Sequence, residues 1–106
     1  AARERAEAEL RAARLGTSAE LRAAWVRTRT AGRLADAYRR SLVPQAEAAL
    51  RVAETGYQAG DNGFLDLLDA QRSLLDDRLE YFQYLDGYEE SLAELERASG
   101  QELRKP

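Results

Sequence analysis

One short segment near the middle of the chain separates two long stretches of helical periodicity. Residues 57–63 form the only dense run of turn-forming residues among the 106. Gly60 can take the left-handed conformation that closes a helix, Asp61 or Asn62 can accept hydrogen bonds from the amides that open the next helix, and Gly63 completes the turn. A single turn at 60–63 between two helical arms predicts an all-α fold, a long antiparallel coiled-coil helical hairpin.

The first arm, about residues 1–59, carries small or apolar residues three or four positions apart, which places them on one face of a helix. These residues are Leu21, Ala24, Thr28, Ala31, Ala35, Tyr38, Leu42, Ala49 and Val52. The glycine and hydroxyl residues at 16–18 are a potential break. Pro44 either kinks the helix or ends it near Leu42. We expect the kink, because an apolar stripe continues through Ala46, Leu50 and Ala53.

The second arm, about residues 64–99, has a heptad row that predicts a helix-packing seam. This seam consists of Leu67, Leu74, Tyr81, Leu85, Tyr88, Leu92 and Leu95. A second row lies beside it, formed by Phe64, Leu68, Leu75 and Phe82. Two rows are more than one partner helix requires, so we expect this arm to contact neighbours on two sides. Gly100 is expected to end the helix and to leave residues 100–106 as a frayed tail.

Composition excludes several classes of function. The chain contains no cysteine, histidine or methionine, so disulfides, imidazole bases and soft metal ligands are absent, and we expect no cofactor and no metal site. Carboxylate pairs such as Asp66 with Asp69, or Asp76 with Asp77, would lie on a solvated rod without a pocket, so we expect no enzyme. No apolar stretch is long enough to cross a bilayer.

Charge divides between the two halves of the chain. Residues 1–60 carry eleven basic and seven acidic side chains, and residues 61–106 carry five and twelve. The halves therefore attract one another. A chain with an acidic total, whose arginines alternate with glutamates, offers no concentrated basic face for phosphates, so we expect no binding of nucleic acid. The acidic second half also argues against a basic helix lying on a membrane surface.

The stretch around the turn resembles a known family. Tyr57 and Gly60 are followed by Phe-Leu-Asp-Leu-Leu-Asp-Ala at 64–70, with Leu-Val-Pro-Gln-Ala-Glu upstream at 42–47 and Leu-Ala-Glu-Leu-Glu downstream at 92–96. This order is similar to the periplasmic tip of the TolC-like outer-membrane factors, the exit ducts of Gram-negative tripartite efflux pumps, and in particular to their heavy-metal-resistance branch. The resemblance covers about residues 34–100, and residues 1–33 match only as generic helix.

The resemblance implies a place in a larger machine. In this family, hairpins from three protomers form a periplasmic α-barrel that stands on a β-barrel in the outer membrane. Residues 1–106 would be a single periplasmic hairpin, the C-terminal one of its protomer, and a fragment of the α-barrel. The implied partners are other copies of the parent protein, as a trimer, and a periplasmic adaptor (membrane fusion) protein. Contact with the outer membrane would be made only by parts that this chain lacks.

The resemblance also assigns roles at the tip. Asp66 and Asp69 match aspartates that line the narrow mouth of the duct, and Tyr57 matches a tyrosine that helps to hold the mouth closed. Asn62 stands where some relatives carry an arginine, and this difference argues against an arginine–aspartate latch without deciding the question. The alternative is that both aspartates only stabilise the first turn of a helix through its dipole.

Two further alternatives stay open on sequence alone. The hairpin could be a coiled-coil interaction module, or an adaptor hairpin that binds a partner helix. The aromatic group Tyr81, Phe82, Tyr84 and Tyr88 could form a ligand site, but its spacing favours packing between helices, and the same holds for Trp25.

Overall fold

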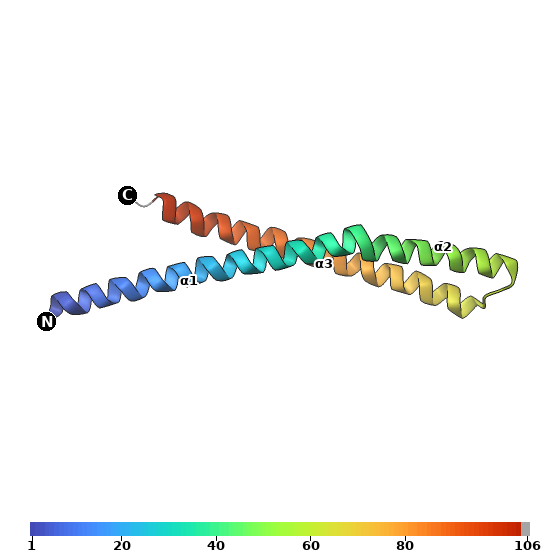
Figure 1. Cartoon of the computed structure of the whole chain (residues 1–106), viewed down its shortest axis with the longest axis horizontal. Helices are drawn as coiled ribbons and strands as arrows, with labels where there is room; N and C mark the ends of the chain where they lie inside the picture. Colours follow the sequence, from blue (N-terminus) through green and yellow to red (C-terminus); the bar gives the residue numbers. More distant parts are fainter. Residues whose placement is uncertain (105–106) are drawn as a thin grey trace.

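A computed structural model describes the backbone of residues 1–104 and the side chains of these residues except 13–15, 17 and 101–104. The described elements are α1 (Ala2–Ala37), the π-helical turn η1 (Tyr38–Leu42), α2 (Val43–Ala59) and α3 (Phe64–Arg104). The first three form one arm, which reverses at residues 60–63 into α3, so the fold is an all-α helical hairpin (Figure 1).

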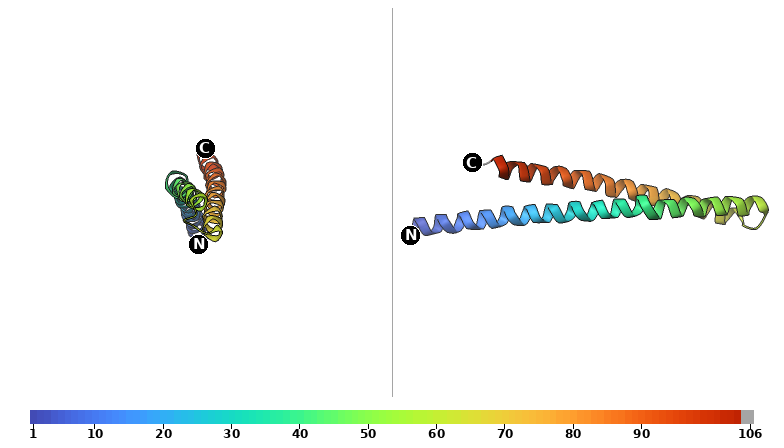
Figure 2. Two further views of the ribbon diagram at one scale, coloured as in Figure 1. Left: turned by 90° about the vertical axis from the view of Figure 1, so that its right-hand side faces the viewer. Right: turned by 45° about the horizontal axis from the view of Figure 1, so that its top comes forward.

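The hairpin is a rod of 84 × 23 × 14 Å. Its first arm runs without interruption from Ala2 to Ala59, and at about 1.5 Å per residue this arm alone accounts for the length. The two arms wind around each other near the middle of the rod and diverge toward the termini (Figures 1 and 2). None of the described helices combines the length and hydrophobicity that a transmembrane span requires.

Two expected helix ends are not present. The potential break at 16–18 does not occur, because α1 continues through these residues. Gly100 does not end the second arm, since α3 runs on to Arg104, and residues 105–106 of the expected tail lie outside the described part. In both places the flanking residues are good helix formers, and one internal glycine costs only about 1 kcal/mol in a helix.

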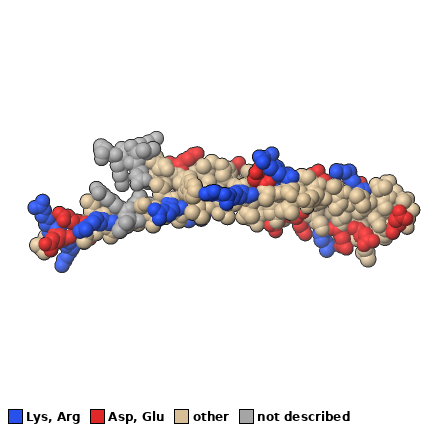
Figure 3. Space-filling model, in the orientation of Figure 1, with Lys and Arg blue, Asp and Glu red and all other residues tan. Residues whose placement is uncertain are grey.

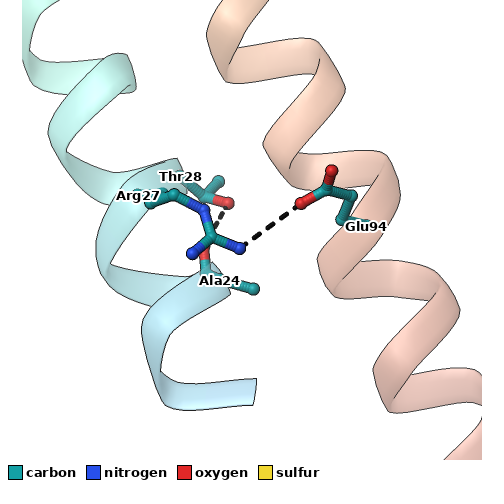
Figure 4. A network of polar contacts seen from close by, with 4 residues as sticks. All are labelled: Ala24, Arg27, Thr28 and Glu94. Atoms are coloured by element: carbon teal, nitrogen blue, oxygen red, sulfur yellow. Dashed lines mark hydrogen bonds and ion pairs between the residues drawn. The ribbon is translucent and has the colours of Figure 1, made fainter. Parts of the chain in front are cut away.

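Small side chains form the centre of the seam between the arms. The buried residues are Ala24, Thr28, Ala35, Ala46, Ala53 and Leu74. The hydroxyl of Thr28 donates a 2.8 Å hydrogen bond to the carbonyl oxygen of Ala24, which satisfies the one buried polar side chain of this list (Figure 4). A Cβ atom at Gly32 would lie 3.1 Å from the ring of Tyr88, so the arms approach closely at this position.

The first arm passes Pro44 through a π-helical turn instead of ending at Leu42. The amide of Val43 donates to the carbonyl oxygen of Tyr38, five residues earlier, and α2 follows with Pro44 in its first turn. Because proline has no amide hydrogen, Pro44 donates no backbone hydrogen bond. The change from the π pattern back to the α pattern therefore occurs where one bond is missing in any case.

The π-helical turn moves the seam along the sequence by one residue. Up to Ala35 the buried residues follow the predicted row, but Leu42, Ala49 and Val52 are exposed, Val52 to 71%. The buried and half-buried positions of α2 are instead Val43, Ala46, Glu47, Leu50, Ala53 and Gly56. The prediction that Leu42, Ala49 and Val52 lie in the seam is therefore wrong, because a π turn adds one residue that a regular heptad pattern does not anticipate.

Candidate functional site at the hairpin tip

Helix α2 ends in a tightly hydrogen-bonded turn. Gly60 takes the left-handed conformation with φ of 84°, its amide donates to the carbonyl oxygen of Tyr57 at 3.1 Å, and the amide of Asp61 donates to Gly56 at 2.8 Å. This pair of bonds is the Schellman motif. Gly60 meets the requirement for positive φ, whereas Gly63 does not have positive φ and a side chain there would point into open space.

Asn62 turns back toward α2 rather than forward to α3. Its backbone amide donates to the carbonyl oxygen of Gly56 at 3.2 Å, and its side-chain nitrogen lies 3.5 Å from the carbonyl oxygen of Ala53. A Cβ atom at Gly56 would lie only 2.7 Å from Cγ of Asn62. The side chain of Asn62 therefore packs on Gly56, a helical position without a side chain. The expected capping of the next helix by Asn62 is not observed.

The aromatic and acidic residues expected at the mouth surround this turn. The rings of Tyr57 and Phe64 meet edge to face across the tip, with 6.1 Å between centroids. Helix α3 begins at Phe64, and Asp66 lies in its first turn. Asp66 and Asp69 are three positions apart on one helical face and are exposed, as is Asp61.

The tip end of the rod is acidic on the face that Figure 3 presents. None of the ion pairs among the described side chains involves Asp66 or Asp69. The positive end of the α3 dipole stabilises a first-turn carboxylate such as Asp66 by roughly 0.3 to 1 kcal/mol. Both carboxylates are thus free to meet a cation or a partner.

Two ion pairs between the arms show how the arms are aligned. Arg27 pairs with Glu94 at 3.4 Å (Figure 4), and Arg78 pairs with Glu47 at 3.6 Å. The first pair joins a basic residue of the first half to an acidic residue of the second, as the charge distribution predicts, and the second pair has the opposite polarity. Both are exposed surface pairs, which contribute about 0–1 kcal/mol each.

Tyr38 is a further contact between the arms, at the start of the π-helical turn. Its hydroxyl donates a 3.1 Å hydrogen bond to Glu80, and its ring lies 5.4 Å from that of Tyr84. Desolvation, together with the bond to Glu80, raises the pKa of Tyr38 above 10.0. Sequence periodicity places Tyr38 in the seam but gives no sign of Glu80, because the partner of a hydroxyl depends on the alignment of the arms.

The predicted seam of α3 faces the first arm. Leu74 is buried, and Leu67, Tyr81, Leu85, Tyr88, Leu92 and Leu95 are half-buried.

An open groove of about 430 Å³ beside Tyr81 and Tyr88 is bordered by Arg29, Arg33 and Arg39. Trp25 is 49% exposed and lies under the guanidinium of Arg29, at 5.2 Å.

The second row of α3 is uncovered. Its residues are exposed to 58% at Phe64, 38% at Leu68, 66% at Leu75 and 57% at Phe82. Leu79, exposed to 57%, extends this row, which we call the outer row (Phe64, Leu68, Leu75, Leu79 and Phe82). Among the described residues, no group of three or more acidic side chains is arranged to hold a metal ion.

Comparisons with known proteins identify relatives of this chain. The model of the outer membrane efflux protein family matches residues 1–101. The cobalt-zinc-cadmium resistance protein CzcC of Cupriavidus metallidurans is 33% identical over 66 residues, which is 62% of this chain. The chain spans only 16% of the length of that relative. No solved structure gives a significant match.

Proposed function

Because this chain belongs to the outer membrane efflux protein family, we propose that it forms one hairpin of the periplasmic α-barrel of an efflux duct. Its tip would form part of the periplasmic mouth of that duct. The role is structural: the helices form the wall of a passage, and the tip controls access to it.

The outer row of α3 carries this proposal. Five large apolar side chains lie on one side of a helix whose other face already packs on the first arm, and each is exposed. Exposed apolar rows of this size mark surfaces that other protein covers. In a barrel every helix has a neighbour on each side, so neighbouring hairpins would cover the outer row.

Assembly of the parent protein tests the proposal. Leu75→Glu changes a side chain that is 66% exposed in the hairpin, so the hairpin itself should still form, while a barrel contact at this position should be lost. Ser73→Glu, at an exposed position on another face of the same turn, is the matched control. We expect the first variant to lose the trimer in native gels of the outer membrane fraction and the second to retain it. A stable trimer of the Leu75→Glu protein would contradict a barrel wall at this row.

We propose further that Asp66 and Asp69 line the mouth. Repetition of these exposed carboxylates around a threefold barrel would produce an acidic ring, which favours cations over anions. The relative from Cupriavidus metallidurans is named for cobalt, zinc and cadmium resistance, and divalent cations are the corresponding candidate cargo. The ring would attract such ions without selecting among them, because this chain contains no cysteine or histidine.

Conductance measurements test the acidic ring. The Asp66→Asn/Asp69→Asn double variant of the parent protein should lower the preference for cations in single-channel recordings. Asp76→Asn/Asp77→Asn, a pair farther from the tip on α3, is the matched control. Equal ion preference in the two variants would reduce Asp66 and Asp69 to helix-capping residues.

The adaptor protein is the proposed partner of the tip. Cross-linking tests the contact, with single cysteines at Gln58, near the end of α2, and at Asp61, within the turn; both positions are exposed. Asn62 is less suitable, because its side chain packs on Gly56. Capture of the adaptor in an assembled pump is expected from Gln58 or Asp61, and absence of capture from both would count against docking at the tip.

A further inference from the structure

We propose that the π-helical turn η1 allows α2 to pack on α3 in two registers. The first is the observed one. In the second, the row that contains Leu42, Ala49 and Val52 turns into the seam. The device is internal to this chain and does not depend on the proposed function.

Helix α2 carries two apolar rows that differ by one residue. The observed row is Val43, Ala46, Leu50 and Ala53. The alternative row is Leu42, Gln45, Ala49 and Val52, and it continues the spacing of Ala24, Thr28, Ala31, Ala35 and Tyr38 in the first part of the arm. The first part of the arm therefore matches the alternative row, and the additional residue of the π turn is what brings the observed row to α3 instead.

A change between the rows requires a rotation by one residue, about 100° for an α-helix. The π turn can supply this rotation. If its hydrogen bonds change from the π pattern, which spans five residues, to the α pattern, which spans four, the turn contains one residue fewer. Pro44, the second residue of α2, donates no amide bond, so no α-type bond from position 44 has to be broken or made.

Composition determines which register dominates. The observed row is entirely apolar, whereas the alternative row contains Gln45. A polar amide in the seam is unfavourable without a partner, so the alternative register is the minor state. If the tip has the proposed role at the mouth of a duct, the same rotation would turn Tyr57 relative to Asp66 and Asp69.

Cysteine cross-linking tests the two registers, and the chain contains no native cysteine. The pair of Glu47 with Arg78 shows which levels of the two arms lie side by side, and it places position 53 of α2 near the level of Ala70, a half-buried residue of α3. Ala53→Cys with Ala70→Cys reports the observed register. Val52→Cys with Ala70→Cys reports the alternative one, because Val52 is 71% exposed as observed. The measurement is the ratio of the two disulfide-capture rates in the full chain.

Two changes should move this ratio in opposite directions. Deletion of Ser41 removes the additional residue of the turn, fixes the observed row in the seam and should slow capture at position 52 about tenfold relative to position 53. Gln45→Leu makes the alternative row apolar and should accelerate that capture about tenfold, since burial of a leucine contributes at least the ~1.4 kcal/mol that a tenfold change requires. Gln58→Leu, an exposed glutamine of α2 in neither row, is the matched control and should leave the ratio unchanged.

The outcomes distinguish two registers from one. The proposal is overturned if the ratio of capture rates is the same in the parent, the Gln45→Leu and the Ser41-deleted chains. It is also overturned if position 53 is captured but position 52 is captured neither in the parent nor in the Gln45→Leu chain. If circular dichroism shows that the Ser41-deleted chain has lost its helix, the comparison of Gln45→Leu with Gln58→Leu decides alone.

Discussion

The contact between Asn62 and Gly56 holds the turn against the end of α2, and its contribution to stability can be tested by substitution. In Gly56→Ala the new Cβ atom would lie 2.7 Å from Cγ of Asn62, well inside van der Waals contact, so the Asn62 side chain would have to leave its position. Two terms oppose one another. Alanine in place of an internal helical glycine stabilises by about 1 kcal/mol. Displacement of a half-buried amide that packs on the helix end costs about 2 kcal/mol.

The sum predicts that Gly56→Ala lowers the free energy of unfolding by about 1 kcal/mol. In an Asn62→Ala background the obstacle is gone, and the same substitution should raise the free energy of unfolding by about 1 kcal/mol. The two effects should thus differ by about 2 kcal/mol, within the range that contacting residues show in double-mutant cycles.

Urea unfolding of the four proteins, followed by far-UV circular dichroism, measures this difference. Gly87→Ala is the control, because an added Cβ atom there meets nothing within 4 Å, and its effect should be the same in both backgrounds. A difference below about 0.5 kcal/mol between the two Gly56→Ala effects would show that packing of Asn62 on Gly56 does not stabilise the hairpin.

Four further predictions follow from the packing and the polar contacts. Leu74→Ala should destabilise by about 3 kcal/mol in urea unfolding, and Leu75→Ala by less than about 0.5 kcal/mol, because the two side chains are 6% and 66% exposed. Gly60→Ala should cost about 1 kcal/mol in the same assay, because φ at this position is 84°. The pKa of Tyr38 is raised above 10.0, so the stability that Tyr38 contributes is complete below that pH and is lost as the pH rises through the raised pKa. Thermal melting should therefore show a smaller alkaline loss in Tyr38→Phe than in the parent chain. Finally, the melting temperature of the isolated chain should rise with protein concentration, as association covers the outer row; a constant melting temperature over a roughly hundredfold range of concentration would contradict this.

The hairpin and its turn were predictable because both depend on local chemistry. Helical spacing, the glycine at position 60 and the polar residues around it act over a few positions each, and the observed turn occupies the predicted residues 60–63. The α3 seam was predictable for the same reason, since its heptad repeat contains no interruption.

Spacing alone did not decide the position of the seam on α2. The sequence offers the stripe through Ala46, Leu50 and Ala53, which is buried or half-buried in the structure, and also the row of Leu42, Ala49 and Val52, which is exposed. Leu42, Ala49 and Val52 fit the repeat of the preceding residues, and only the π turn places them outside. Pro44 is the local signal that the repeat is disturbed, but a proline is compatible with a kink, a restart or a π turn. The role of Asn62 was missed for a different reason: its partner is a glycine six residues earlier, and the absence of a side chain leaves no pattern in a sequence.

The seam between the arms contains small side chains, whereas the outer row contains large ones. The buried positions of the first arm are mainly alanines, Ala24, Ala35, Ala46 and Ala53, while Leu75 and Phe82 remain more than half exposed. Burial contributes about 0.8 kcal/mol per CH₂ group, so an alanine seam allows close approach of the arms but supplies little stabilisation. The large side chains of the outer row therefore hold hydrophobic free energy that the hairpin itself leaves unused. We expect assembly with neighbouring helices to supply that part, which makes formation of a rigid arm and formation of a barrel coupled steps.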